Sequence, residues 1–176
     1  MGTTFLSTSF EDFADAPAVD TPGCTGVQMF VGQSSLLTDC CGFCSASEFP
    51  NTLLDNIRER GAMDVLMSNH ANCEMSARVK DILRALMIGH WKSEPHCQHQ
   101  NFADHRWGHV KANLEWLVAF SDVDPDCWSL ALNCACSVMN LTAEKMLGWR
   151  APQEAATGQT PDICILLFFV FWDIAC

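Results

Sequence analysis

The sequence predicts one α/β domain organised around a mixed sheet. Three observations predict this class: short β-type apolar segments come first, two further short strands follow, and helical segments alternate with those strands. With 176 residues, of which 49% are hydrophobic and 18% charged, the chain is long enough to bury a sizeable core. There is no internal repeat or low-complexity linker to mark a second folding unit.

The first part of the chain is predicted to form strands. An early strand is expected at about Phe10–Ala16, ending before Pro17. Val27–Val31, Val-Gln-Met-Phe-Val, is predicted to form a strand that is closed by Gly32. Ser34–Cys41 is a second short apolar run after a polar turn. The last two segments therefore predict a β-hairpin.

Helices and two short strands are predicted to follow. Ser47 is expected to cap a helix that ends at Gly61, and Ser76 to cap a second one that ends at Gly89. Each has apolar residues at helical spacing. The remaining predicted elements are a strand at Asp64–Ser68, a segment His90–Pro95, and helices at Asn101–Phe120, Cys127–Asn140 and Gln153–Thr157.

The charge of the chain is unusual for a protein that binds nucleic acid. The net charge is −11, and affinity for phosphate comes largely from Lys and Arg. The bases are unevenly distributed, because residues 61–120 contain six of the ten, balanced by six acids. This middle third is either a DNA-facing region or an ordinary balanced surface.

Cysteine usage and hydropathy predict an intracellular protein outside the membrane. The eleven cysteines are expected to be free thiols in a reducing compartment, since the chain is neither small nor preceded by a visible signal peptide. The apolar run Ile163–Trp172 is about half the roughly 20 residues needed to cross a bilayer. The pair Cys41 and Cys44 lacks the second pair that a zinc knuckle needs.

Histidines offer one alternative metal site. His105 and His109 are four residues apart on one face of a predicted helix, and His96 and His99 precede them. Imidazoles at this spacing can bind zinc or copper. No glutamate lies between His105 and His109 to form a metalloprotease motif, and polar residues around a helix start give the simpler interpretation.

Ser93-Glu94-Pro95 is followed by a polar turn, and Gln100-Asn101 precede a helix with Asp104 in its first turn. This run, from Trp91 to Trp107, resembles the last part of the catalytic core of copia-type retrotransposon integrases, which are relatives of retroviral integrases. Phe102, Asp104 and His105 replace the family's proline, glutamate and arginine. Further matches, in order, are 58–62, 76–81, 147–152 and 158–163.

This resemblance implies a ribonuclease-H-like fold, a mixed sheet flanked by helices. It implies an integrase catalytic core-like domain at residues 1–145 and a truncated tail at 146–176. In this fold the first acid lies on the first strand, the second at the end of the fourth strand and the third at the start of the long helix. The matching metal-binding and catalytic positions are Asp15, Asn69 and Asp104.

The resemblance also implies the cofactor and partners. Mg²⁺ or Mn²⁺ would bind weakly if at all, DNA would be contacted by Gln100, Asn101 and Lys111, and the core would form a homodimer. The ancestral reaction is metal-dependent DNA strand transfer with 3′ processing.

Two departures from the family pattern predict weak activity or none. Asn69 replaces an aspartate, so one metal ligand is neutral. Asp104 is one methylene shorter than glutamate, and a shift of about 1 Å can cost roughly 100-fold in rate. The alternative hypothesis is a non-enzymatic remnant of the same fold that binds nucleic acid or protein.

Overall fold

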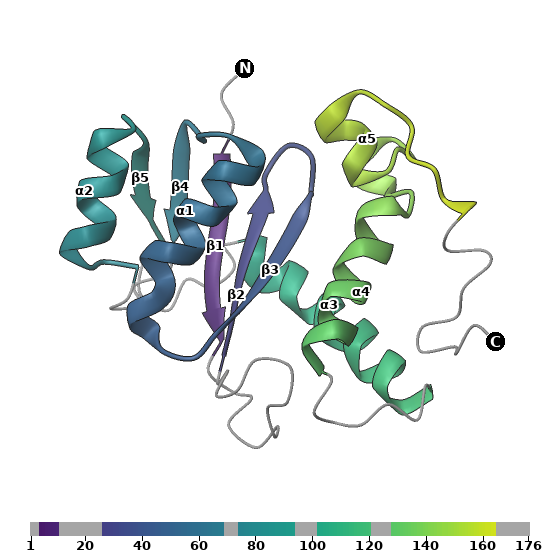
Figure 1. Cartoon of the computed structure of the whole chain (residues 1–176). Coiled ribbons are helices and arrows are strands. Elements are labelled where there is room, and N and C mark those ends of the chain that lie inside the picture. The colour runs from purple at the N-terminus through teal and green to yellow at the C-terminus, as the bar shows by residue number, and fades with distance from the viewer. Residues whose placement is uncertain (1–3, 11–25, 69–73, 94–101, 121–127, 165–176) are drawn as a thin grey trace.

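The computed structural model describes residues 4–10, 26–68, 74–93, 102–120 and 128–164 and shows a five-stranded mixed sheet between two helical layers (Figure 1). The strand order is β3-β2-β1-β4-β5. β1–β2 and β2–β3 are antiparallel, whereas β1–β4 and β4–β5 are parallel. The strands are β1 (Thr4–Phe10), β2 (Gly26–Gly32), β3 (Thr38–Phe43), β4 (Val65–Ser68) and β5 (Gly89–Lys92).

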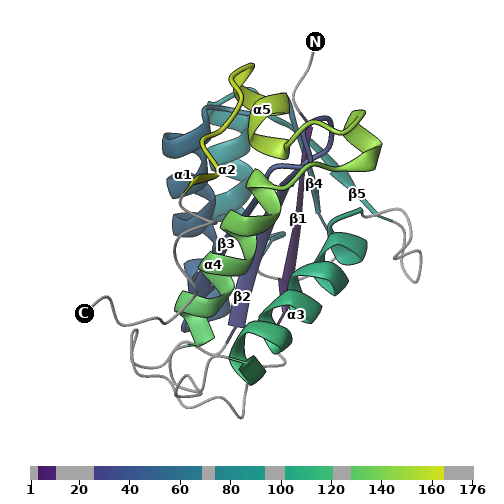
Figure 2. The same ribbon diagram turned by 90° about the vertical axis from the view of Figure 1, so that its right-hand side faces the viewer.

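Helices cover both faces of this sheet (Figures 1 and 2). α1 (Phe49–Arg60), preceded by the 3₁₀ turn η1 (Ala46–Glu48), and α2 (Ala77–Ala85) lie on one face. α3 (Phe102–Phe120) and α4 (Trp128–Leu141) lie on the other. The 3₁₀ turn η4 (Lys145–Leu147) and the short helix α5 (Pro152–Thr157) follow, and α5 contacts α4. Within the described ranges, no helix has both the length and the apolar character required to span a bilayer.

β2 joins the two hydrophobic cores because both of its faces are buried. All seven residues of the strand are buried. Val27, Met29 and Val31 belong to the cluster beneath α3 and α4, while Phe30 belongs to the cluster beneath α1 and α2. Side chains alternate along a strand, so a central strand covered on both sides supplies one residue to each core in turn.

Local sequence signals account for most element boundaries. α1 ends at Gly61, whose φ of 89° lies in the region that favours glycine, and α2 begins at Ser76, whose hydroxyl accepts a hydrogen bond from the Val79 N–H at 3.4 Å. The predicted hairpin is confirmed by the antiparallel pairing of β2 and β3. The predicted cap at Ser47 is wrong: Ser45 caps η1, and Glu48 precedes α1.

The predicted strand at Phe10–Ala16 overlaps the observed first strand only at Phe10, and residues 11–16 lie outside the described residues. β1 is Thr4–Phe10 and pairs with β2 on one side and with β4 on the other. Four of its seven residues carry hydroxyls, so the segment lacks the apolar run that marks other strands. Pairing with two neighbours outweighs this weak local preference.

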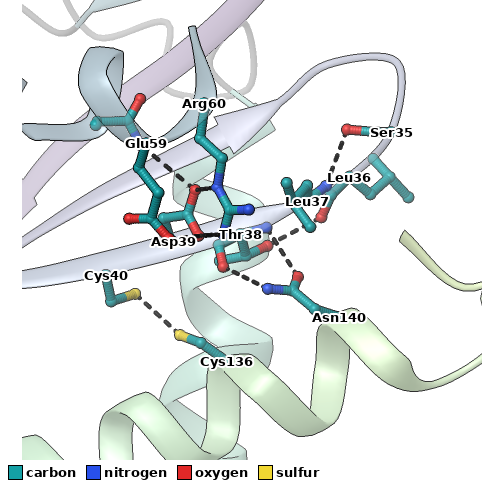
Figure 3. A network of polar contacts seen from close by, with 11 residues as sticks. Ser35, Leu36, Leu37, Thr38, Asp39, Cys40, Glu59, Arg60, Cys136 and Asn140 are labelled. Atoms are coloured by element: carbon teal, nitrogen blue, oxygen red, sulfur yellow. Dashed lines mark hydrogen bonds and ion pairs between the residues drawn. The ribbon is translucent and has the colours of Figure 1, made fainter. Parts of the chain in front are cut away.

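The outer edge of β3 is held by the side chain of one asparagine (Figure 3). Asn140, near the end of α4, accepts a hydrogen bond from the Thr38 N–H at 2.9 Å and donates one to the Thr38 carbonyl at 2.8 Å. Both residues are buried. The amide therefore satisfies both main-chain groups of Thr38 and fixes α4 against β3.

We expect Asn140→Ala to destabilise the protein by about 2 kcal/mol, because it leaves two buried main-chain groups without a partner. The measurement is urea unfolding with a thiol reductant present. Asn133→Ala is the matched control, because Asn133 is exposed on the same helix and its loss should change stability by no more than about 0.5 kcal/mol. Equal costs for the two variants would contradict the role given to Asn140.

Candidate functional site

The parallel strands β1, β4 and β5 have their carboxyl ends side by side. Ser68, the last residue of β4, pairs with Ser7 of β1 on one side and with Lys92 of β5 on the other. The Ser93 N–H donates to the Ser68 carbonyl at 3.1 Å. Ligands of α/β proteins commonly bind beyond the carboxyl ends of parallel strands, so these ends are the candidate site.

A buried serine and a histidine fix the end of β4. The Ser68 hydroxyl and His90 Nε2 are hydrogen-bonded at 2.7 Å. Burial, with smaller contributions from Lys92 and Lys80, lowers the pKa of His90, which favours a neutral ring that can share a hydrogen bond with a hydroxyl. Ser68 is fully buried, so it positions the chain and cannot meet a substrate. Sequence reasoning missed this pair, because the two residues come together only through strand register.

α3 places Asp104, Lys111 and Glu115 along one stripe of its surface. Ala103, Trp107, Val110 and Leu114 bury one side of the helix in the core beneath it. Asp104 lies in the first turn and is partly exposed, whereas Lys111 is exposed. Seven residues make nearly two turns, so Asp104 and Lys111 lie on one stripe about 10 Å apart along the axis.

The structure describes two of the six predicted site residues. Asp104 and Lys111 occupy the helical positions predicted for them. Asp15, Asn69, Gln100 and Asn101 lie outside the described residues. The convergence of Asp15, Asn69 and Asp104 on one metal site stays a prediction, as do the DNA contacts.

The position of β1 bears on the first predicted ligand. The resemblance requires a carboxylate on the first strand, but Thr4–Phe10 contains neither aspartate nor glutamate. Asp15 follows the end of this strand by five residues. Asp15 itself lies outside the described residues, so its place as the first metal ligand stays a prediction.

Arg106 belongs to the protein interior. It is 4% exposed, forms an ion pair with Glu144, and donates from Nε to the Thr38 hydroxyl at 3.3 Å. Arg106 lies two residues after Asp104, so the sequence alone suggests a base that could contact DNA. In the structure it joins α3 to β3 and to the segment that follows α4. It is committed to packing, which leaves Lys111 as the nearest exposed base on the helix.

The alternative histidine site consists of two rings in the described part of the chain. The rings of His105 and His109 meet edge to face, with centroids 5.2 Å apart, and both residues are exposed. They border a hollow of about 390 Å³ between α3 and the end of α4. His96 and His99 lie outside the described ranges. Within those ranges, no three His, Cys, Asp or Glu side chains are grouped to share a metal, and Cys41 and Cys44 are not joined by a disulfide.

Comparisons with known proteins identify similar structures. No protein-family model and no curated protein matches the sequence. The simian T-cell lymphotropic virus intasome, solved in complex with the PP2A regulatory subunit B56 gamma, matches with a TM-score of 0.73 at 15% identity. The match covers 92% of this chain and 58% of that one, so this chain spans little more than half the length of that relative.

The isolated HTLV-2 integrase catalytic core domain is also similar. Two structures of it with magnesium, described as trimeric and dimeric, match with a TM-score of 0.67 at 11% identity, covering 88% of this chain and 96% of theirs. At such identities the likeness establishes the fold. The chain has the mixed α/β fold of retroviral integrase catalytic cores, as the resemblance predicted.

Proposed function

We propose that residues 1–145 are an integrase-type catalytic core of copia-type retrotransposon descent, with weak or no DNA strand-transfer activity. Residues 146–176 form the tail that follows the core. The observation that carries this proposal is the strand order β3-β2-β1-β4-β5 followed by a long helix with Asp104 in its first turn. The integrase cores that share the fold support it.

In this proposal, Asp104, Asn69 and Asp15 provide the oxygen ligands for Mg²⁺ or Mn²⁺. Bound metal would activate the attacking hydroxyl and stabilise the leaving one. Met67 packs against the core beneath α3 and α4. Because side chains alternate along a strand, a residue continuing β4 past Ser68 would face the same side as Met67. This supports Asn69 as the neighbour of Asp104.

DNA would lie along the outer stripe of α3. Lys111 is exposed on the stripe that begins at Asp104, and Gln100 and Asn101 come directly before the helix. One base offers little attraction for a phosphate backbone, and the net charge of −11 opposes binding. We therefore propose weak DNA binding.

The alternative is a non-enzymatic remnant that binds nucleic acid or protein. Asn69 and the absence of a carboxylate from β1 favour it. The arginines favour it as well, because four of them pair with acids of the same chain and are less available to phosphate. These pairs are Arg58–Asp55, Arg60–Asp39, Arg84–Asp81 and Arg106–Glu144.

Restoring the two altered ligands tests the proposal. We expect the double variant Asn69→Asp with Asp104→Glu to bind Mg²⁺ more tightly than the natural sequence, since it regains one negative charge and the longer side chain. Strand transfer should rise by about 100-fold or more, the factor attached to a 1 Å displacement. The measurements are Mg²⁺ titration by calorimetry and joining of short duplex DNA in Mg²⁺ or Mn²⁺.

Two further substitutions in the restored background sharpen this test. Asp15→Asn should remove the gained activity, whereas Asp81→Asn, on the exposed surface of α2, should leave it unchanged. If the restored protein neither binds Mg²⁺ in the millimolar range nor joins DNA, the enzymatic proposal fails and the non-enzymatic remnant is favoured. If the gained activity survives Asp15→Asn, Asp15 is not a metal ligand, but the enzymatic proposal stands.

A further inference from the structure

Two thiols from distant parts of the chain meet between β3 and α4 (Figure 3). The Cys136 thiol donates a hydrogen bond to Cys40 Sγ, and the two sulfur atoms are 3.1 Å apart. The residues are 96 positions apart in the sequence. A disulfide bond is about 2.05 Å long, so the sulfurs need to approach by roughly 1 Å to bond.

The surrounding hydrogen bonds hold these thiols in register. Asn140 follows Cys136 by one helical turn and bonds both main-chain groups of Thr38, which precedes Cys40 by two residues on the same strand. The next residue of the strand is Asp39. Its carboxylate accepts two hydrogen bonds from the Arg60 guanidinium, at 2.9 and 2.6 Å. Asn140 thus fixes α4 against β3, and Arg60 fixes α1 against the same strand, in both cases on a residue that comes just before Cys40.

A hollow beside β3 gives a small oxidant access to the sulfur pair. Cys40 and Cys136 line a hollow of about 300 Å³ that is bordered by β3, α1 and α4. Cys136 is 5% exposed, which leaves little room for a bulky reagent. Hydrogen peroxide is small enough to enter such a hollow.

A metal ion fits this pair less well than a covalent bond. Two thiolates on one zinc, each bonded at 2.3 Å in tetrahedral geometry, would be about 3.8 Å apart. In the part of the chain that the structure describes, no third His, Cys, Asp or Glu completes a group with them. The contact is already shorter than a bridging metal requires.

We propose that Cys40 and Cys136 form a reversible disulfide that locks α4 to β3 when the protein meets hydrogen peroxide. One thiol attacks the peroxide, becomes a sulfenic acid and releases one water. The second thiol attacks the sulfenic sulfur, forms the S–S bond and releases a second water. Two thiols and one peroxide thus give one disulfide and two waters, and a dithiol reverses the reaction.

The reduced form should persist without an oxidant. The adjacent Cys136 thiol and burial raise the pKa of the Cys40 thiol well above its usual value. Burial also raises the pKa of Cys41 to about 11. Since thiolates are the reactive species, crosslinking should be slow near pH 7 and should accelerate as the pH rises.

The experiment treats the reduced full chain with hydrogen peroxide, blocks remaining thiols with N-ethylmaleimide, and maps disulfides in a non-reducing protease digest. We expect a linked pair of peptides containing Cys40 and Cys136. We also expect an unfolding midpoint about 5–10 °C higher that returns to its starting value with dithiothreitol.

Cys136→Ala should abolish both the linked peptides and the thermal shift. Cys134→Ser, at a partly buried position two residues earlier on α4, should retain both. The disulfide map of the natural protein tests the proposal even if a variant fails to fold. Two N-ethylmaleimide-blocked thiols after peroxide, or a link from Cys40 to Cys41 or Cys44, would overturn the proposal.

Discussion

Phe30→Ala should destabilise the protein by about 4 kcal/mol, the largest effect that we expect from a single substitution. Phe30 is fully buried in β2 and packs beneath α1, where its ring centroid lies 6.3 Å from that of Phe49. Removing the ring loses its transfer free energy and leaves a cavity under α1. Since the neighbours of Phe30 belong to a sheet held from both sides, they can collapse into that space only partly.

Urea unfolding with a thiol reductant measures this effect, and two controls separate packing from general sensitivity. Phe30→Leu keeps most of the volume and should cost about 1–2 kcal/mol. Phe120→Ala removes the same ring from an exposed position and should cost about 0.5 kcal/mol, part of it from stacking on Trp116. A cost below about 1 kcal/mol for Phe30→Ala would refute a core between the sheet and α1.

Glu144→Ala should have the second largest effect, a loss of about 3 kcal/mol. Arg106 is buried, so removing its acidic partner leaves a charge with little access to water. The Glu144 side chain is 31% exposed, which permits some hydration of the site and keeps the estimate at the lower end of the range for buried pairs.

A double-mutant cycle measures the Arg106–Glu144 interaction by urea unfolding. Arg106→Met combined with Glu144→Ala should be more stable than Glu144→Ala alone, because the unpaired charge is gone. The exposed pair Arg58–Asp55 is the matched control, and Asp55→Ala should cost no more than about 0.5 kcal/mol. Equal costs for Glu144→Ala and Asp55→Ala would show that Arg106 is solvated.

Local signals in the sequence were enough to predict most of the helices. α3 at Phe102–Phe120 and α4 at Trp128–Leu141 agree closely with the predicted 101–120 and 127–140, since both have an apolar face at helical spacing. The Gly61 stop and the Ser76 cap were also predicted. These features depend on neighbours within about one helical turn, so the sequence contains them directly.

Features that depend on distant partners were not predictable. Residues 4–9 of β1 were not predicted as strand, because this hydroxyl-rich sequence is stabilised by pairing with β2 and β4. The burial of Arg106 depends on Glu144, 38 residues away. Of the candidate site, the helical spacing of Asp104 and Lys111 could be predicted, whereas the Ser68–His90 bond required the register of β4 and β5.

The amide of Asn140 has a consequence for association between sheets. An additional strand laid alongside β3 would need the N–H and C=O of Thr38, and Asn140 already takes both. Among the described strands, β5 ends the opposite side of the sheet. A contact that extends the sheet would therefore avoid Thr38 on β3, and β5, where Trp91 is exposed, offers the other edge among the described strands.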